Sequence, residues 1–381
     1  MNRNINLFYL FNFFADFRFY APIAIIYFSQ VSGSYALGMS IFSATYLSSA
    51  LFEIPTGVFS DYIGRKKTIL LGSLFLTFGI FCYALGFSYW VLLLGAVAEG
   101  ISRSFFSGNN TALLYDTLSE QGRVNIYHEV LGKTSSMDQV ALAISAVLGS
   151  FIAAKSFPLV FWLSILSPVV CILLSFLFKE PKIHKKESTN IYNHLAESLK
   201  LFITNKKLRY LSLSGILSYG IGESAWMFRS AFIQLLWPIW AIGLAQTASN
   251  IGGALSFYFS GKLINKFNEY KLIIFSGIYS FVINLVSLIF PTVASPALMS
   301  STSLLFGTNM VAEDNLMQKA FTNQQRATMG SLNNFGQSIC FGIFSIILGI
   351  VADKVGPINA LIFAVILGAP VTLLYFKSYR S

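Results

Sequence analysis

Long apolar stretches, each of roughly 20 residues, recur along the whole chain and constrain its fold more than any other feature. As a helix, one such stretch crosses the roughly 30 Å hydrocarbon core of a bilayer. Backbone amides cannot stay unpaired in lipid, and the alternating pattern of membrane β-barrels is missing, so these stretches predict helices. We expect twelve of them, at residues 5–30, 35–60, 68–88, 90–114, 135–154, 157–178, 209–235, 238–260, 271–290, 295–317, 329–351 and 357–376.

The composition agrees with a chain that lies mostly within a membrane. Of the 381 residues, 55% are hydrophobic and 11% are charged, and the mean hydropathy is +0.65. A soluble globular domain of this size does not reach these values. The three cysteines fall inside spans, without the spacing of a disulfide framework or a metal site. Hydrolase signatures and a complete phosphate loop are missing as well, so we expect no cofactor, no metal and no enzymatic activity.

The net charge of +10 follows the predicted topology. Most of the 26 Lys and Arg residues fall in loops on one side of the membrane, whereas only Lys155 and Lys354 fall in loops on the other side. Loops rich in Lys and Arg face the cytoplasm. We therefore expect a multi-pass protein of the inner or plasma membrane with both termini in the cytoplasm, a first helix that is retained, and no nucleic-acid binding.

A polar segment from Lys179 to about Asn205 divides the spans into two groups of six. We expect an amino-terminal six-helix bundle at residues 1–180, a cytoplasmic linker at 181–206 and a carboxy-terminal six-helix bundle at 207–381. Within the linker, apolar residues recur at helical spacing beside lysines. This pattern predicts an amphipathic helix that contacts membrane lipids on the inner leaflet.

Internal repeats indicate that the two halves share one fold. The turn at Gly57 recurs in weaker form at Gly261, and Asn109 recurs as Asn309, with offsets of about 200 residues. The stretch that begins at Gly349 also matches the turn at Gly57 but lies on the opposite side of the membrane, as an inverted three-span unit requires. The sequence therefore predicts an all-α membrane protein with twelve transmembrane helices in two pseudo-symmetric six-helix bundles.

The turn after the second span, Gly57-Val-Phe-Ser-Asp61-Tyr-Ile-Gly64-Arg65-Lys66-Lys67, carries the most specific motif of the chain. Gly57 would let two helices approach closely, Gly64 would permit a tight reversal, and the basic cluster cannot cross the bilayer. Asp61, at the membrane edge, is placed to accept hydrogen bonds from an Arg side chain or from the amino terminus of a facing helix. A positive-inside stop signal with turn glycines would contain the same residues.

This turn resembles the signature of the major facilitator superfamily, Gly-x-x-x-Asp-x-x-Gly-Arg-Lys/Arg between spans two and three. The resemblance extends over the six-plus-six layout, the central loop and the weaker copy of the turn, where Asn265 and Asn268 replace the Asp and the second Gly. It implies that the first helix of each three-span unit lines a central cavity. It also implies a conformational latch formed by Gly57, Asp61, Gly64, Arg65 and Lys66.

Charged residues inside spans cost roughly 2.5–3.5 kcal/mol each on insertion scales, so their positions are informative. The deepest ones fall on the helices that the resemblance places around the cavity. Glu313 and Asp314 lie near the inner end of span ten, and we do not expect them to bind substrate. The candidate residues for proton coupling or for lining the cavity are Asp16, Arg18, Glu99, Arg103, Glu223, Trp226 and Arg229.

The spacing of these charges predicts how they pair. Glu99 and Arg103 are four residues apart on one helix face, so they can form an ion pair, which would be either structural or functional. Asp16 and Arg18 are two residues apart and are expected on different faces. Asp16 would then be free to take up a proton or to meet another helix, which makes it the leading candidate for proton coupling.

We expect a secondary active transporter that works by alternating access, moves a small-molecule substrate and exports small amphiphiles in exchange for protons. One departure from the family argues against antiport, because span five keeps Gly149 but lacks the proline of the exporters' Gly-Pro-rich motif. An alternative is uptake or facilitated diffusion of an anionic metabolite, with Arg18, Arg103 and Arg229 as ligands. A lipid scramblase, or another non-transporting protein with a transporter fold, is a third alternative.

Overall fold

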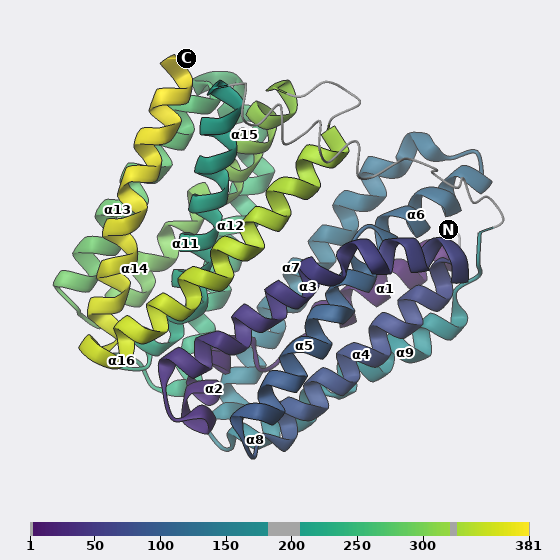
Figure 1. The fold of residues 1–381 in the computed structure, drawn as a ribbon, viewed down its shortest axis with the longest axis horizontal. Helices are drawn as coiled ribbons and strands as arrows, with labels where there is room; N and C mark the ends of the chain where they lie inside the picture. Colours follow the sequence, from purple (N-terminus) through teal and green to yellow (C-terminus); the bar gives the residue numbers. More distant parts are fainter. Residues whose placement is uncertain (1–2, 182–205, 321–325, 381) are drawn as a thin grey trace. The chain divides into compact units, whose positions relative to one another are not determined.

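Helices make up almost all of the described chain (Figure 1), which in this computed structural model comprises residues 3–181, 206–320 and 326–380. No strand occurs in these three ranges. The predicted all-α class is therefore confirmed. The amphipathic helix expected in the linker lies outside the described residues.

The first six predicted spans each correspond to one helix or to two helices separated by a short break. The break in span four falls at Gly108, whose φ of 66° is left-handed. The break in span six precedes Pro168, whose ring excludes a helical bond to the carbonyl of Ser164. The elements are α1 Arg3–Asp16, η1 Ala21–Ile23, α2 Ala24–Ser32, α3 Tyr35–Ile63, α4 Arg65–Leu85, α5 Tyr89–Phe106, α6 Asn109–Glu120, η2 Val124–Ile126, α7 Tyr127–Ala153, α8 Phe157–Ser164 and α9 Leu166–Leu177.

The last six spans follow the same pattern. Spans eleven and twelve run together in one long helix, which is divided at Gly356, where φ is 85° and ψ is 165°. Pro357 follows directly, so the second part begins with a residue that suits the first turn of a helix. The elements are α11 Lys206–Ile233, α12 Ile239–Phe267, α13 Glu269–Ile289, α14 Ser295–Ser301, α15 Ser303–Ala320 and α16 Arg326–Arg380.

Seven helical stretches in the described part of the chain are long and apolar enough to cross a membrane. They cover predicted spans two to six, nine, eleven and twelve, because Leu332–Lys377 contains two spans. The other predicted spans are broken, as in α1–α2 and α14–α15, or carry charged and polar residues, as in α11 and α12. Helices nevertheless occupy all twelve predicted spans, which confirms the twelve-helix architecture. The candidate functional residues lie at or just after the end of α1, on α5 and on α11.

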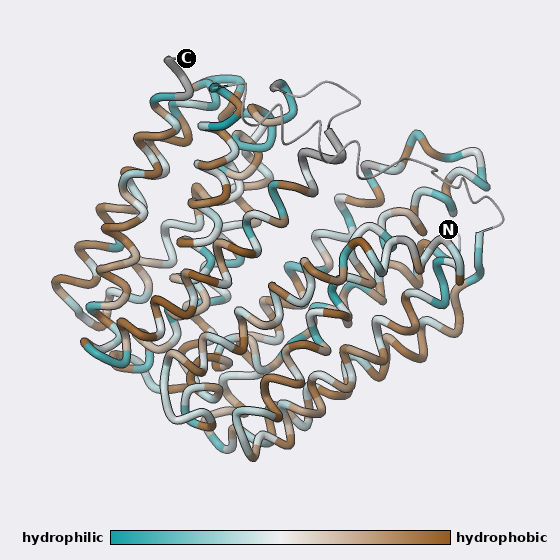
Figure 2. Tube along the Cα trace, viewed as in Figure 1, coloured by the Kyte–Doolittle hydropathy of each residue, from teal (hydrophilic) through white to brown (hydrophobic). Residues whose placement is uncertain are grey.

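The chain divides into two compact units. The first contains Met1–Gly33, Ser40–Glu187 and Pro238–Thr247, and the second contains Ser34–Met39, Ser188–Trp237 and Ala248–Ser381. Figure 2 shows hydrophobic residues along the full length of the helices in both units. The domain boundaries expected from the sequence stay a prediction.

The core of the first unit is rich in aromatic side chains. One cluster joins Tyr27, Phe28, Tyr83 and Phe161, which are all at least nine-tenths buried. Helices α4 and α5 lie side by side (Figure 1) and approach closely where two glycines face each other. A Cβ atom on Gly79 would lie 2.8 Å from the carbonyl oxygen of Gly95. This close approach brings the polar side chains of the two helices within reach of one another.

Candidate functional site

Arg18 is the centre of a buried charged network in the first unit. Its Nη1 atom lies 3.0 Å from Oε1 of Glu99, and its Nη2 atom lies 3.2 Å from Oδ1 of Asp16. Its Nε atom donates to the carbonyl oxygen of Ala15 at 3.2 Å. The expectation that Asp16 and Arg18 point apart is wrong, because α1 ends at Asp16 and helical spacing no longer applies to the residues that follow.

Glu99 lies on α5 and is only 6% exposed. Its second carboxylate oxygen, Oε2, accepts a hydrogen bond from the Tyr83 hydroxyl at 2.9 Å. Tyr83 reaches it from α4 because the small residues Gly79 and Gly95 let the two helices meet. Both oxygens of this carboxylate are thus bonded, one to a cation and one to a neutral donor.

Arg103 lies one helical turn after Glu99 on α5. Its guanidinium lies over the ring of Tyr46 on α3, 4.6 Å from the ring centroid. The sequence allowed an ion pair between Glu99 and Arg103. The cation that the structure places directly against Glu99 is Arg18, from another part of the chain.

Asp138, on α7, is a partly buried carboxylate that the sequence interpretation missed. Its Oδ1 atom is buried and has no hydrogen-bond partner among the residues that the structure describes. Its helix packs against α1, which ends at Asp16. Asp138 falls inside predicted span five, so the same test of charged residues within spans would have found it.

In the second unit, Arg229 and Trp226 of α11 lie together, with the guanidinium 5.0 Å from the ring centroid. Arg229 donates to the carbonyl oxygen of Met299 at 3.3 Å and to Oδ1 of Asn284 at 3.4 Å. Glu223 lies six residues before Arg229 on the same helix and is partly buried. The candidates predicted in the second half therefore all lie on α11.

Glu313 and Asp314 differ in their surroundings. Glu313 is partly buried on α15, and its Oε1 atom accepts a hydrogen bond from Nδ2 of Asn309 at 2.6 Å. Asp314 is exposed and accepts a hydrogen bond from Gln318. The two neighbouring acids therefore lie on different faces of α15, Glu313 on a partly buried face and Asp314 on an exposed face.

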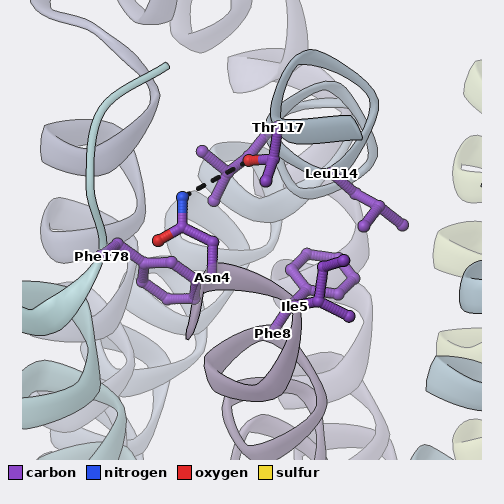
Figure 3. A pocket seen from close by; sticks show the side chains of 7 residues that line it. Asn4, Ile5, Phe8, Leu114, Thr117 and Phe178 are labelled. Carbon is purple, nitrogen blue, oxygen red and sulfur yellow. Dashed lines mark hydrogen bonds between the residues drawn. The ribbon is translucent and has the colours of Figure 1, made fainter. Parts of the chain in front are cut away.

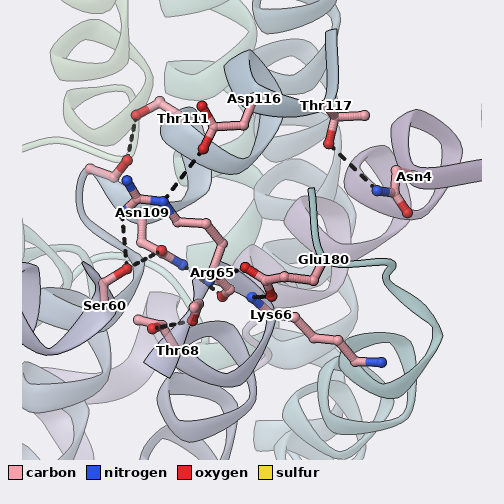
Figure 4. Close-up of polar contacts among 12 residues, drawn as sticks. Asn4, Ser60, Arg65, Lys66, Thr68, Asn109, Thr111, Asp116, Thr117 and Glu180 are labelled. Atoms are coloured by element: carbon pink, nitrogen blue, oxygen red, sulfur yellow. Dashed lines mark hydrogen bonds and ion pairs between the residues drawn. The ribbon is translucent and has the colours of Figure 1, made fainter. Parts of the chain in front are cut away.

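The predicted latch turn contains a helix cap that the sequence did not reveal (Figure 4). Gly64 has a φ of 91°, which confirms its role in the reversal. The first two amides of α4, those of Arg65 and Lys66, donate to the two carboxylate oxygens of Glu180 at 2.7 and 2.8 Å. A carboxylate at this place satisfies free amides and complements the helix dipole.

The Arg65 side chain joins this turn to α6. Its Nη1 atom donates to the Ser60 hydroxyl at 2.9 Å, and its Nε atom lies 3.6 Å from Oδ2 of Asp116. Asn109 accepts a hydrogen bond from Ser60 at 2.6 Å and donates to the carbonyl oxygen of Arg65 at 3.2 Å (Figure 4). One polar cluster therefore connects the end of α3, the start of α4 and α6.

Of the remaining latch residues, the structure describes the surroundings of Gly57 and Lys66. A Cβ atom on Gly57 would meet nothing within 4 Å, so the expected close approach of helices at Gly57 is wrong. Lys66 donates through Nζ to the carbonyl oxygen of Phe176 at 2.8 Å. The side chain of Asp61 lies outside the described part of the structure.

The two copies of the turn in the second half also end in helix caps. Asn268 has a φ of 69° and accepts a hydrogen bond from the amide of Tyr270 at 3.0 Å, so α13 is capped by its own turn. After Gly349, the Asp353 carboxylate accepts hydrogen bonds from the amides of Tyr35 and Ala36, at 2.6 and 2.9 Å. These two residues begin α3 and belong to the same unit as Asp353.

A small pocket in the first unit, between α1, α6 and Phe178, does not suit a solute (Figure 3). Its empty volume is about 160 Å³, open solvent included, whereas ligand pockets usually have about 300–1,000 Å³. Its polar group, the Asn4 amide, already donates to Thr117 at 3.5 Å and to the carbonyl oxygen of Lys179 at 2.9 Å. The charged network around Arg18 is the stronger candidate site.

Comparisons with known proteins agree with this architecture. The family model described as Major Facilitator Superfamily matches residues 7–344. The quinolone resistance protein NorA of Staphylococcus aureus is 24% identical over 369 residues, with 91% of each chain covered. A crystal structure of the nucleoside transporter NupG superimposes with a TM-score of 0.80 at 10% identity and covers all of both chains.

A bacterial homologue of the human lysosomal transporter Spinster, solved in an inward-facing and unoccupied conformation, gives a TM-score of 0.76 at 14% identity. It covers 99% of this chain and 96% of that chain. At such low identity the solved structures show the fold alone. The family match extends from the first span to the eleventh, and this protein therefore belongs to the Major Facilitator Superfamily.

Proposed function

We propose that this protein exports small amphiphilic compounds across the membrane in exchange for protons. Its membership of a transporter family and the name of its relative NorA, a quinolone resistance protein, support export. The observation that carries the proposal is the buried network around Arg18. A charged cluster of this kind inside membrane spans is costly and marks ion or substrate pathways.

The charge balance of the network supports proton exchange. Three carboxylates, those of Asp16, Glu99 and Asp138, accompany the two guanidiniums of Arg18 and Arg103. One carboxylate is therefore in excess, and neighbouring carboxylates bind protons as a coupled group. Glu99 is held by both Arg18 and Tyr83. Among the described residues, Asp16 has Arg18 alone as an ion-pair partner, and Oδ1 of Asp138 has no hydrogen-bond partner. We therefore assign the proton exchange to Asp16 and Asp138.

Alternating access would use the capped turn between α3 and α4 as a latch. Arg65 and Asp116 form its ion pair, Ser60 accepts a hydrogen bond from Arg65, and Glu180 accepts hydrogen bonds from the first two amides of α4. Release of these contacts would let α3 and α4 move relative to α6. In this proposal the latch controls conformation, and the substrate is bound elsewhere.

The proposal is tested with purified protein in proteoliposomes under an imposed pH gradient. The transported probe is an amphiphilic rhodamine dye in its ethyl-ester form, followed by fluorescence. We expect gradient-driven accumulation that falls at least tenfold in Asp16→Asn and Asp138→Asn, while dye exchange without a gradient continues. Glu120→Gln, which alters an exposed acid at the end of α6, is the matched control.

Two results would contradict this proposal. Gradient-driven transport that survives in both variants would exclude Asp16 and Asp138 as the coupling residues. Wild-type dye movement that ignores the pH gradient would exclude proton coupling. Counterflow of an anionic metabolite in the latter case would support the second candidate function, facilitated diffusion. That function is favoured because no carboxylate lies within 4.0 Å of Arg229 among the residues that the structure describes.

A further inference from the structure

Arg229 differs from the other arginine at the centre of a predicted site. Arg18 has two carboxylates within ion-pair distance. Within the described residues, no carboxylate lies within 4.0 Å of the Arg229 guanidinium, and its polar contacts are two neutral oxygens. A cation among spans without a counter-charge is an incomplete arrangement.

The contacts of Arg229 orient it without saturating it. A guanidinium has five N–H donors. Two of them are used, at 3.3 and 3.4 Å, which is beyond the usual range for an N–H···O bond. The Trp226 ring packs against the guanidinium at 5.0 Å. The side chain is thus held by α11, α13 and α14 while donors remain for a further acceptor.

We propose that Arg229 binds the anionic group of an amphiphilic ligand, a carboxylate or a phosphate, and that Trp226 contacts the apolar part beside that group. Carboxylates and phosphates match the planar fork of a guanidinium with two parallel hydrogen bonds. The aromatic ring beside the cation suits a flat or apolar body. The anion supplies the missing counter-charge, so ligand binding completes the arrangement.

This inference extends the proposed function by naming the chemical class of the ligand. Only the statement that this ligand is the transported compound rests on the proposed function. Binding itself is independent of proton coupling and of the network around Arg18. The anionic group has two possible sources, a solute and a lipid headgroup. Binding is therefore measured without any gradient, so that its failure and the failure of proton-coupled export can be distinguished.

The solute arm compares one rhodamine dye in two forms, the free carboxylic acid and its ethyl ester, which differ only in the anionic group. Fluorescence anisotropy reports their affinities for the protein in nanodiscs of phosphatidylcholine. We expect the acid to bind at least tenfold more tightly than the ester. That preference is expected to vanish in Arg229→Gln and to persist in part in Arg229→Lys, which keeps the charge but loses the fork.

The lipid arm compares thermal unfolding in phosphatidylcholine nanodiscs with and without phosphatidylglycerol. An increase of the midpoint by phosphatidylglycerol that is lost in Arg229→Gln, but kept in the exposed control Lys262→Gln, assigns the site to a lipid phosphate. Equal affinity of the wild type for acid and ester, together with a wild-type unfolding midpoint that phosphatidylglycerol does not raise, would overturn the proposal. The wild-type comparison decides this even if Arg229→Gln fails to fold.

Discussion

At the scale of single residues, the Tyr83 hydroxyl is the neutral donor that completes the hydrogen bonding of Glu99. Tyr83→Phe would leave one oxygen of a buried carboxylate without a partner, and such a loss costs about 1–3 kcal/mol. We expect a clear decrease of the unfolding midpoint in detergent. The matched control is Tyr89→Phe, whose hydroxyl bonds to Ser40 in a less buried position, and an equal decrease in both variants would contradict the role of Tyr83.

Two glycines of similar helical context are predicted to respond in opposite ways, and this prediction belongs to the scale of elements. Gly79→Ala would place a Cβ atom 2.8 Å from the Gly95 carbonyl oxygen, and forced overpacking costs about 1–3 kcal/mol. Gly57→Ala meets nothing within 4 Å, and Ala is favoured over Gly inside a helix by about 0.5–1 kcal/mol. Thermal unfolding tests both expectations, a lower midpoint for Gly79→Ala and a higher midpoint for Gly57→Ala. A lower midpoint for Gly57→Ala would instead support the close approach of helices that the sequence predicts at Gly57.

The start of α4 depends on Glu180, an acid that lies three residues after the end of α9. Removing a carboxylate that caps a helix costs about 0.5–2 kcal/mol, so Glu180→Ala is expected to lower the unfolding midpoint and to expose the turn at Gly64 to proteolysis. Glu180→Gln keeps an acceptor but loses the charge, and it should have an intermediate effect. Glu120 lies at the C-terminus of α6, where a carboxylate caps no amide, so Glu120→Ala should leave the unfolding midpoint unchanged. A turn that stays resistant to protease in Glu180→Ala would contradict the cap.

At the scale of the whole molecule, the distribution of Lys and Arg predicts orientation, and labelling can test it. Lys155→Cys and Lys354→Cys should react with a membrane-impermeant maleimide added outside intact cells, whereas Lys67→Cys and Lys266→Cys should react only after permeabilisation. The native cysteines Cys82, Cys171 and Cys340 are buried, so the background should be low. The reverse pattern of labelling would invert the topology.

The sequence by itself determined the class of fold, because spans of about 20 apolar residues leave helices as the only solution in lipid. It also predicted the reversal at Gly64, since a tight turn there requires a left-handed φ. Only the tertiary structure decided which charges meet. Helical spacing predicts neighbours on one helix, as for Glu99 and Arg103, but contacts between helices depend on packing. The pairing of Arg18 with Glu99 and the cap by Glu180 therefore emerged only when the helices were assembled. The same holds for Arg229, which has no carboxylate within 4.0 Å in the described part of the chain.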